Sequence, residues 1–250
     1  MKLFKQILGR IFAVWGILVF VITMLPVFLT IWLIGKMKEP NRTVTFRMLC
    51  KHWMQVFFFF TGCRLKIKGA ANFRKKENYI VICNHNSLFD VPVTTPFIPG
   101  PPNKTIAKIE MASTPLFGLI YRRGSVLVDR KRTNSRRDSF NKMKEVLRLG
   151  MHMCIYPEGT RNRSSLPLKD FQDGAFRLAM ETKTSIMPAL IFNTRKVLPP
   201  GKPFFFWPCR MEMHFLPPRE IKESDTHDIL KKELFEKMFQ YYEDNAPLLN

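Results

Sequence analysis

The first feature of the chain is a long apolar segment near its N-terminus. Residues 11–35 form a run of 25 positions without a charged side chain. As a helix, this run would be roughly 37 Å long, enough to cross a hydrocarbon core of about 30 Å. It is too long for the core of a signal peptide, and no small-residue cleavage site follows it. The pattern therefore predicts a retained membrane anchor.

Two arrangements of this anchor in the membrane stay open. Basic residues flank the segment on both sides, so their distribution favours no orientation. Pro26 lies in its middle and would break or kink a helix, and a second apolar stretch follows at residues 53–60. We favour a helical hairpin in one leaflet over a single span. A buried helix of a soluble core is a third interpretation, but the uncharged run exceeds the usual length of such helices.

From residue 64 onward, short β-branched runs alternate with amphipathic segments. This alternation is typical of an α/β fold, in which helices flank a mostly parallel sheet. We therefore expect membrane-anchoring helices over residues 1–62 and an α/β domain over residues 63–250. The predicted strands are residues 79–83, 105–108, 125–128, 152–156, 185–192 and 211–215.

Two helices can be predicted with their boundaries. Within residues 129–150 the apolar side chains fall on one helical face, and Gly150 supplies a stop. An apolar residue recurs every fourth position from Leu230, which predicts a covering helix over about residues 225–244.

Charge and cysteine content narrow the classes of function. The 40 Lys and Arg residues exceed the 20 Asp and Glu residues, which gives a net charge of +20. A field of this strength attracts nucleic acid, an anionic bilayer or phosphorylated substrates. The five cysteines are widely spaced and form no CxxC or Cys/His cluster. We therefore expect reduced thiols, a reducing compartment and no metal site.

The strongest local motif is NHNSLFD, residues 84–90, at the end of a predicted buried strand. On one helix, His85 and Asp90 would lie about 140° apart, too far round to pair. With His85 in the turn and Asp90 in the first turn of the next helix, the carboxylate can fold back onto the imidazole. Such a pair suits general base catalysis, because the Asp fixes the tautomer while the other ring nitrogen takes a proton from a hydroxyl. An isolated HxxxxD spacing also arises by chance.

A second motif, YPEGTR at residues 156–161, follows another predicted strand. Its Pro and Gly159 shape a tight turn. The backbone amides of the turn, with Thr160 and the fork of Arg161, form a plausible phosphate cradle, and Glu158 is placed to steady that fork. A surface turn with a Glu158–Arg161 ion pair is an equally simple interpretation.

Two more cations end predicted strands, Lys108 in AKIEM and Arg130 in GSVLVDR. The carboxyl ends of parallel strands meet at one edge of a sheet, where ligands bind. His85, Lys108, Arg130 and residues 158–161 should therefore converge at this edge.

At this point the chain resembles the glycerolipid acyltransferases. The family's blocks read here as NHNSLFD, GSVLVDR, YPEGTR and IMPALI in the family's order, with FQDGAFRLA after the third, and the resemblance covers about residues 78–191. It implies transfer of a fatty acyl group from acyl-CoA or acyl carrier protein to the sn-2 hydroxyl of lysophosphatidate. It also implies a membrane-embedding helical motif before the α/β domain. By this resemblance the first block carries catalysis, and the second and third blocks bind the acceptor's phosphate.

The proposed acyl transfer also implies a set of catalytic residues, partners and a location, and it has alternatives. The reaction needs no cofactor beyond the acyl thioester as co-substrate, with His85 and Asp90 as catalytic residues. The expected partners are anionic membrane lipid and the two substrates, with the α/β domain on the cytoplasmic face of a membrane. Another lysolipid acceptor and thioester hydrolysis are the enzymatic alternatives. A basic protein that binds anionic lipid or nucleic acid is the non-enzymatic one, but it leaves four ordered motifs unexplained, so we expect no nucleic acid partner.

Overall fold

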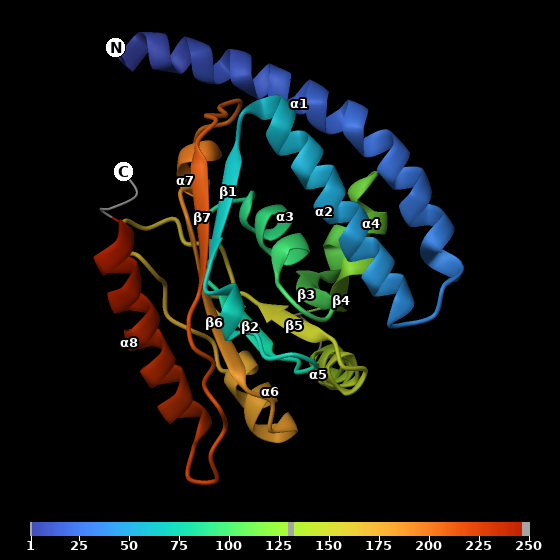
Figure 1. Ribbon diagram of the computed structural model, residues 1–250, viewed down its shortest axis with the longest axis vertical. Coiled ribbons are helices and arrows are strands. Elements are labelled where there is room, and N and C mark those ends of the chain that lie inside the picture. Colours follow the sequence, from blue (N-terminus) through green and yellow to red (C-terminus); the bar gives the residue numbers. More distant parts are fainter. Residues whose placement is uncertain (1, 130–132, 247–250) are drawn as a thin grey trace.

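The structure is a computed structural model that describes residues 2–129 and 133–246. Within these residues seven strands form one sheet, and helices cover both of its faces (Figure 1). The strands are β1 (Arg64–Lys68), β2 (Ile80–Cys83), β3 (Asn103–Lys108), β4 (Ser125–Val128), β5 (His152–Ile155), β6 (Ile186–Phe192) and β7 (Arg210–Phe215). The α-helices are α1 (Lys2–Leu33), α2 (Asn41–Thr61), α3 (Asp90–Thr94), α4 (Phe117–Gly124), α5 (Thr133–Arg148), α6 (Gly174–Thr182), α7 (Thr194–Val197) and α8 (His227–Asn245). Short 3-10 helices are η1 (Ile34–Lys36), η2 (Ala70–Asn72), η3 (Thr95–Phe97) and η4 (Ile109–Ser113).

The order of strands in the sheet is β1-β7-β6-β2-β5-β3-β4. The five strands from β6 to β4 run parallel to one another. β7 runs antiparallel to β6, and β1 runs parallel to β7. The predicted α/β class with a mostly parallel sheet is therefore confirmed. The carboxyl ends of the five parallel strands share one edge of the sheet, as predicted.

Alternating side chains of the strands enter two separate cores. On one face, Ile80 and Ile82 of β2 pack with residues of α5, α6 and α8. On the other face, Val81 and Cys83 join a core that includes residues of α1, α2 and α3. Successive side chains of a strand point to opposite faces. A run that is apolar throughout, such as β2, is therefore what a sheet covered on both faces requires.

The two predicted helices are confirmed as α5 and α8. Gly150 follows α5 with a φ of 73°, and its N–H donates to the carbonyl of Leu147 at 3.0 Å. The next N–H, of Met151, donates to the carbonyl of Val146 at 3.2 Å. These two bonds satisfy the last carbonyls of the helix, and the glycine permits the left-handed backbone that they need. At the start of α8, the hydroxyl of Thr226 accepts a backbone N–H and caps the helix.

β1 is absent from the predicted strands. It is a short strand that pairs with β7, and Arg64, Lys66 and Lys68 alternate with partly buried Leu65 and Ile67. Its three cations point outward, as is common on strands that protect the edge of a sheet. With only two apolar residues, β1 carries too weak a period-two pattern to separate it from a polar loop.

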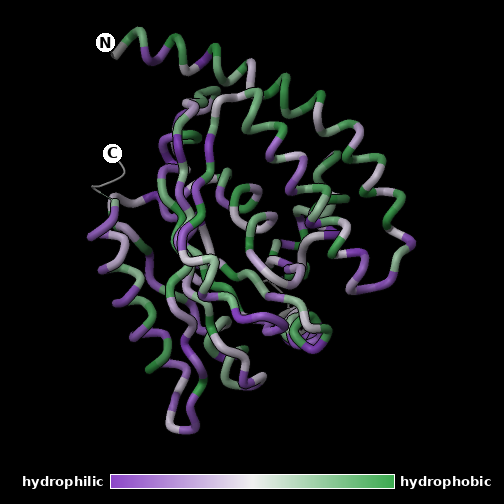
Figure 2. The backbone as a smooth tube through the Cα atoms, viewed as in Figure 1, coloured by the Kyte–Doolittle hydropathy of each residue, from purple (hydrophilic) through white to green (hydrophobic). Residues whose placement is uncertain are grey.

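α1 and α2 form a helical hairpin against one face of the sheet (Figure 1). The helical stretch Leu3–Lys36 is long and apolar enough to cross a membrane by length and composition, and 22% of its most apolar part is buried within the protein. α1 continues through Pro26, and most of its length is hydrophobic (Figure 2). Its outer face exposes large apolar side chains, as a membrane anchor would. The arrangement in one leaflet stays a prediction.

α2 attaches this hairpin to the sheet. Within the second apolar stretch, Met54 and Phe57 are buried in the core that α2 shares with the sheet, whereas Phe59 is 80% exposed. Arg47 adds polar attachment, because its Nη1 donates to the carbonyls of Ile98, Gly100 and Pro101, each at 2.9 Å. The predicted boundary at residue 62 falls between α2 and β1, but a cut there would expose the apolar face of the sheet.

Candidate active site

His85 and Asp90 meet at the carboxyl end of β2, as the motif predicted. His85 follows the strand in a turn, and Asp90 is the first residue of α3. The His85 Nδ1 lies 2.8 Å from Asp90 Oδ2. Because a carboxylate oxygen only accepts, this contact places the proton on Nδ1 and leaves Nε2 as the basic nitrogen. The side chain of His85 is 18% exposed, whereas that of Asp90 is fully buried.

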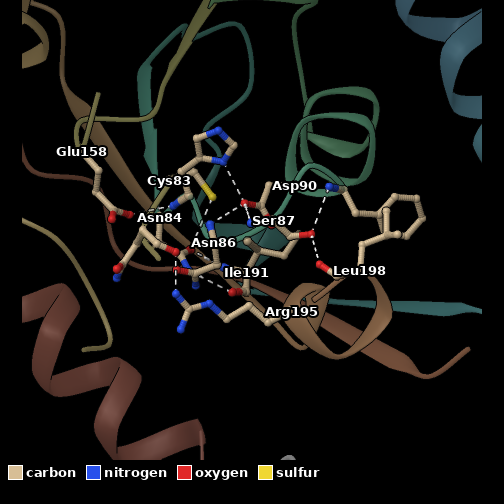
Figure 3. Close-up of polar contacts among 12 residues, drawn as sticks. Cys83, Asn84, Asn86, Ser87, Asp90, Glu158, Ile191, Arg195 and Leu198 are labelled. Atoms are coloured by element: carbon tan, nitrogen blue, oxygen red, sulfur yellow. Dashed lines mark hydrogen bonds and ion pairs between the residues drawn. The ribbon is translucent and has the colours of Figure 1, made fainter. Parts of the chain in front are cut away.

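The turn between them is built around the same carboxylate oxygen. Asp90 Oδ2 also accepts the backbone N–H groups of Asn86, at 2.5 Å, and Ser87, at 2.7 Å (Figure 3). The Ser87 hydroxyl in turn accepts the N–H of Phe89 at 3.2 Å. Three donors on one oxygen fix the carboxylate in place. The position of the imidazole is therefore set by the backbone of its own loop.

The YPEGTR turn holds the backbone of His85 from the neighbouring strand β5. Glu158 Oε1 accepts the N–H of His85 at 2.7 Å (Figure 3), and its Oε2 accepts the N–H of Lys169 at 3.0 Å. The carbonyl of His85 accepts the N–H of Asn162 at 2.6 Å. Burial raises the pKa of Glu158 to about 7, against the effect of the two amides. The motif predicts that Glu158 steadies Arg161, but both oxygens of Glu158 bind backbone amides, and Glu158 positions the His85 loop.

Asn84 continues the sheet where the backbone pairing of β2 ends. Its Oδ1 accepts the N–H of Ile191 at 2.7 Å, and its Nδ2 donates to the carbonyl of the same residue at 3.0 Å (Figure 3). The side chain is fully buried. Asn84 thus acts as one more peptide group between β2 and β6, and it fixes the start of the catalytic loop.

This role predicts a stability effect. Asn84→Ala should lower the free energy of unfolding by about 2 to 5 kcal/mol, because a buried donor and a buried acceptor of Ile191 lose their partners. Denaturant titration in detergent, followed by circular dichroism, measures it. Asn245→Ala is the matched control, since Asn245 donates to Tyr241 within the partly buried end of α8. An equal, small effect of both substitutions would contradict this role of Asn84.

The rest of the YPEGTR turn lies beside the imidazole. The rings of Tyr156 and His85 are 4.6 Å apart between centroids. Gly159 has a φ of 71° and closes the turn through its N–H to the Tyr156 carbonyl at 3.0 Å. Thr160 Oγ1 accepts from Lys169 Nζ at 3.1 Å. Arg161 is half-buried near Tyr121 of α4, where its charge opposes the rise that burial causes in the pKa of that phenol.

The two remaining predicted cations, Lys108 and Arg130, are not among the described residues that contact His85. Lys108 is exposed at the end of β3, two strands from β2, so about 10 Å of sheet separates it from the His85 strand. Arg130 lies outside the described residues. Of the residues predicted to converge, Glu158 contacts His85 directly and Arg161 lies on the same turn as Glu158. Lys108 lies at the same edge of the sheet, two strands away.

Cys83 precedes this loop and is fully buried. Burial raises the pKa of its thiol well above the ordinary value. The thiolate is the nucleophilic form, so this residue is unsuited to covalent catalysis. A hydroxyl that binds near His85 Nε2 is instead the group that the site can activate.

Sequence reasoning missed two residues that support the loop, Asn162 and Arg195. Arg195 Nη2 donates to the Asn162 carbonyl at 2.5 Å. The Asn162 Oδ1 accepts the N–H of Ser164 at 2.9 Å, which folds the segment after the YPEGTR turn. Asn162 was visible as the residue after the motif, but no sequence signal connects Arg195 to it.

Comparisons with known proteins agree with these motifs. A family model described as Acyltransferase matches residues 64–192. The chain is 30% identical over 173 residues to 1-acyl-sn-glycerol-3-phosphate acyltransferase alpha of Mus musculus, which covers 67% of this chain and 59% of that protein. It is 30% identical over 182 residues to the 1-acyl-sn-glycerol-3-phosphate acyltransferase of Saccharomyces cerevisiae, with 70% and 56% covered.

A bacterial relative and a solved structure extend the comparison. The 1-acyl-sn-glycerol-3-phosphate acyltransferase of Borreliella burgdorferi is 29% identical over 142 residues, 56% of each chain. The chain thus spans 56 to 59% of the length of these three relatives. The crystal structure of the 1-acyl-sn-glycerophosphate acyltransferase PlsC from Thermotoga maritima superposes with a TM-score of 0.78 at 19% identity. That superposition covers 95% of this chain and 96% of the other, and it shows a common fold.

Proposed function

Because the chain belongs to the acyltransferase family, we propose that it transfers a fatty acyl group from a thioester to the sn-2 hydroxyl of lysophosphatidate, with phosphatidate as product. The observation that carries this proposal is the His85–Asp90 pair, in which a buried carboxylate holds Nδ1 at 2.8 Å. The names of the relatives in mouse, yeast and Borreliella support the choice of acceptor.

In the proposed reaction His85 Nε2 takes the proton of the acceptor hydroxyl while that oxygen attacks the thioester carbonyl carbon. Asp90 stabilises the imidazolium that forms. The carbon–sulfur bond then breaks, and the imidazolium returns its proton to the departing thiolate. The acyl group is now an ester, and His85 is neutral again. The thioester is a substrate here, and no separate cofactor takes part.

One experiment tests the reaction, the donor and the acceptor together. Purified full-length protein is incubated with labelled acyl-CoA or labelled acyl carrier protein and a panel of lysolipids that differ in headgroup. We expect labelled phosphatidate only with lysophosphatidate. Consumption of the thioester without any acceptor would instead identify a hydrolase. A labelled product from a different lysolipid would show that the proposed acceptor is wrong and that the proposed acyl transfer is right.

Arg161 is the proposed ligand for the acceptor phosphate, on the turn beside His85. Arg161→Ala should raise the acceptor KM by about 10 to 100-fold, since a charge-assisted hydrogen bond contributes about 1.5 to 3 kcal/mol, and should leave the donor KM nearly unchanged. Initial rates with each substrate varied in turn measure this. Arg163→Ala is the control, because Arg163 is exposed two residues along the same segment. Equal increases in both KM values would indicate a collapsed turn or a donor site.

We further propose that the α/β domain lies on the cytoplasmic face of the membrane, with anionic lipid as a partner. The net charge of +20 supports attraction to anionic headgroups, and five cysteines without a pairing pattern support a reducing compartment. Protease protection in sealed membrane vesicles of known orientation tests the side.

A further inference from the structure

An aromatic loop joins α7 to β7 and lies outside the proposed reaction site. Residues 202–207 read KPFFFW, and we call them the aromatic loop. Phe204 is 68% exposed and has a φ of 51°. Non-glycine residues rarely adopt this left-handed backbone, which here turns a large apolar side chain toward solvent. Packing within the protein therefore accounts for Phe205 and Phe206 but leaves Phe204 without a partner surface.

This loop is joined to the N-terminal half of α1. The N–H of Phe206 donates to the carbonyl of Gly9 at 2.9 Å. The ring of Phe205 lies so close to Gly9 that a Cβ there would come within 2.2 Å of it, so only glycine permits this approach. Trp207 packs edge to face on Phe12 at 5.9 Å between centroids. Figure 1 shows the loop, in orange, beside α1.

The part of α1 that the loop contacts also carries exposed apolar side chains. Leu3 and Phe4 of α1 are 75% and 68% exposed, and Ile7 is 52% exposed. These residues lie in the two turns before Gly9, on the side of the helix that faces away from the loop. Phe204 is thus a second exposed apolar side chain near the N-terminal half of α1, carried by the loop that contacts Gly9. An exposed apolar side chain on a loop that is fixed to a membrane-anchoring helix is expected to meet the same membrane.

The charges around the loop match the surface of an anionic bilayer. Lys202 Nζ lies 5.5 Å from the centre of the Phe205 ring, and Lys5 Nζ lies 4.9 Å from that of Trp207. Aromatic rings beside cationic side chains are the composition that membrane proteins place at the headgroup level. Both lysines sit at the junction of loop and helix, where headgroups would lie if the apolar side chains entered the acyl region.

We propose that the aromatic loop is a second membrane-docking element, which inserts Phe204 into the interface of an anionic bilayer beside the N-terminal half of α1. The base of the loop touches the catalytic loop, because the Leu198 carbonyl accepts the hydroxyl of Ser87 at 2.9 Å. The backbone N–H of Trp207 donates to the Val197 carbonyl at 3.0 Å and closes the loop. Docking at Phe204 would therefore hold the catalytic loop at a fixed height above the lipid.

A fluorescent probe at position 204 tests the insertion directly. Phe204→Cys is made together with Cys209→Ser, because the other four cysteines are buried, and the thiol is labelled with an environment-sensitive dye. Full-length protein is reconstituted into vesicles of phosphatidylglycerol and phosphatidylcholine, with and without lipids that carry a bromine quencher. Ile17→Cys, on the exposed face of α1, is the positive control, and Ile229→Cys, 52% exposed on α8, is the negative control.

We expect the dye at 204 to shift to shorter wavelength and to lose at least half as much emission to the quencher as the dye at 17. A dye at 204 that matches the one at 229 would overturn the proposal. So would a shift at 204 that needs no lipid but grows with protein concentration in detergent, since the loop would then contact a second copy of the chain. The readout does not depend on acyl transfer, so a failure of the proposed reaction leaves this test intact.

Discussion

His85→Ala is expected to slow acyl transfer by about 10² to 10⁴-fold, the loss typical of a missing general base. The Nε2 of His85 is the basic nitrogen that the site leaves available, because Nδ1 is occupied by Asp90 Oδ2 at 2.8 Å. Alanine at this position removes the ring but keeps the two backbone contacts of residue 85, from Glu158 and Asn162. The loop should therefore stay folded, and lysolipid binding should stay close to that of the unmodified protein.

Single-turnover transfer at saturating substrates measures this loss, with circular dichroism to confirm folding. His227→Ala is the control, since His227 begins α8, and α8 packs on the opposite face of the sheet from α3. A folded His85→Ala protein that keeps a third of the original rate would show that His85 is not the general base. A control variant that loses as much activity would indicate general damage.

The sequence was sufficient for most of the fold because the apolar pattern is strong where the sheet is covered on both faces. β2 and β6 are continuous apolar runs, which only a doubly covered strand needs. The His85–Asp90 pairing was also predictable, since only residues 84–89 separate the end of β2 from the start of α3. Residues 85 and 90 are only five positions apart, so their contact depends on the local chain, which can be predicted from the sequence.

The supports of the site were not predictable for the opposite reason. Asn84 binds Ile191 across 107 positions, and Glu158 binds the His85 amide across 73. These bonds join a side chain to a backbone, and every residue presents the same backbone groups. Glu158 is an example. In the sequence its obvious partner is Arg161, but in the structure the Glu158 carboxylate is buried under the turn and binds the amide of His85.

Asp90→Asn is expected to reduce the transfer rate by about 10² to 10⁴-fold, through loss of charge. The contacts of Asp90 determine the orientation of the side-chain amide in Asp90→Asn. Asp90 Oδ2 accepts from His85, Asn86 and Ser87, so the amide oxygen must take this position, because an NH₂ group there would face three donors. The Asp90 Oδ1 is buried without a hydrogen-bond partner among the described residues, so the NH₂ group would take the place of this oxygen.

The same tautomer of His85 should thus persist in Asp90→Asn, and the variant tests the carboxylate charge with the geometry kept. Its effect should lie in the chemical step, so single-turnover rates should fall while the acceptor KM changes little. Asp90→Ala is the comparison. It leaves the N–H groups of Asn86 and Ser87 without their acceptor, so it should also lower the free energy of unfolding by about 2 to 5 kcal/mol. If Asp90→Asn were as unstable as Asp90→Ala, the charge could not be judged separately from the fold.

The pairing itself is tested by combining Asp90→Asn with His85→Ala. In the proposed mechanism the charge of Asp90 affects the reaction through the imidazole, so once the ring is gone this charge has no imidazolium to stabilise. The double variant should therefore be scarcely slower than His85→Ala alone, and the two losses should not multiply. Rates of all four proteins, measured in one single-turnover series, give the coupling between the residues. Independent and multiplying losses would mean that Asp90 acts on the substrate or the fold by a route that does not pass through His85.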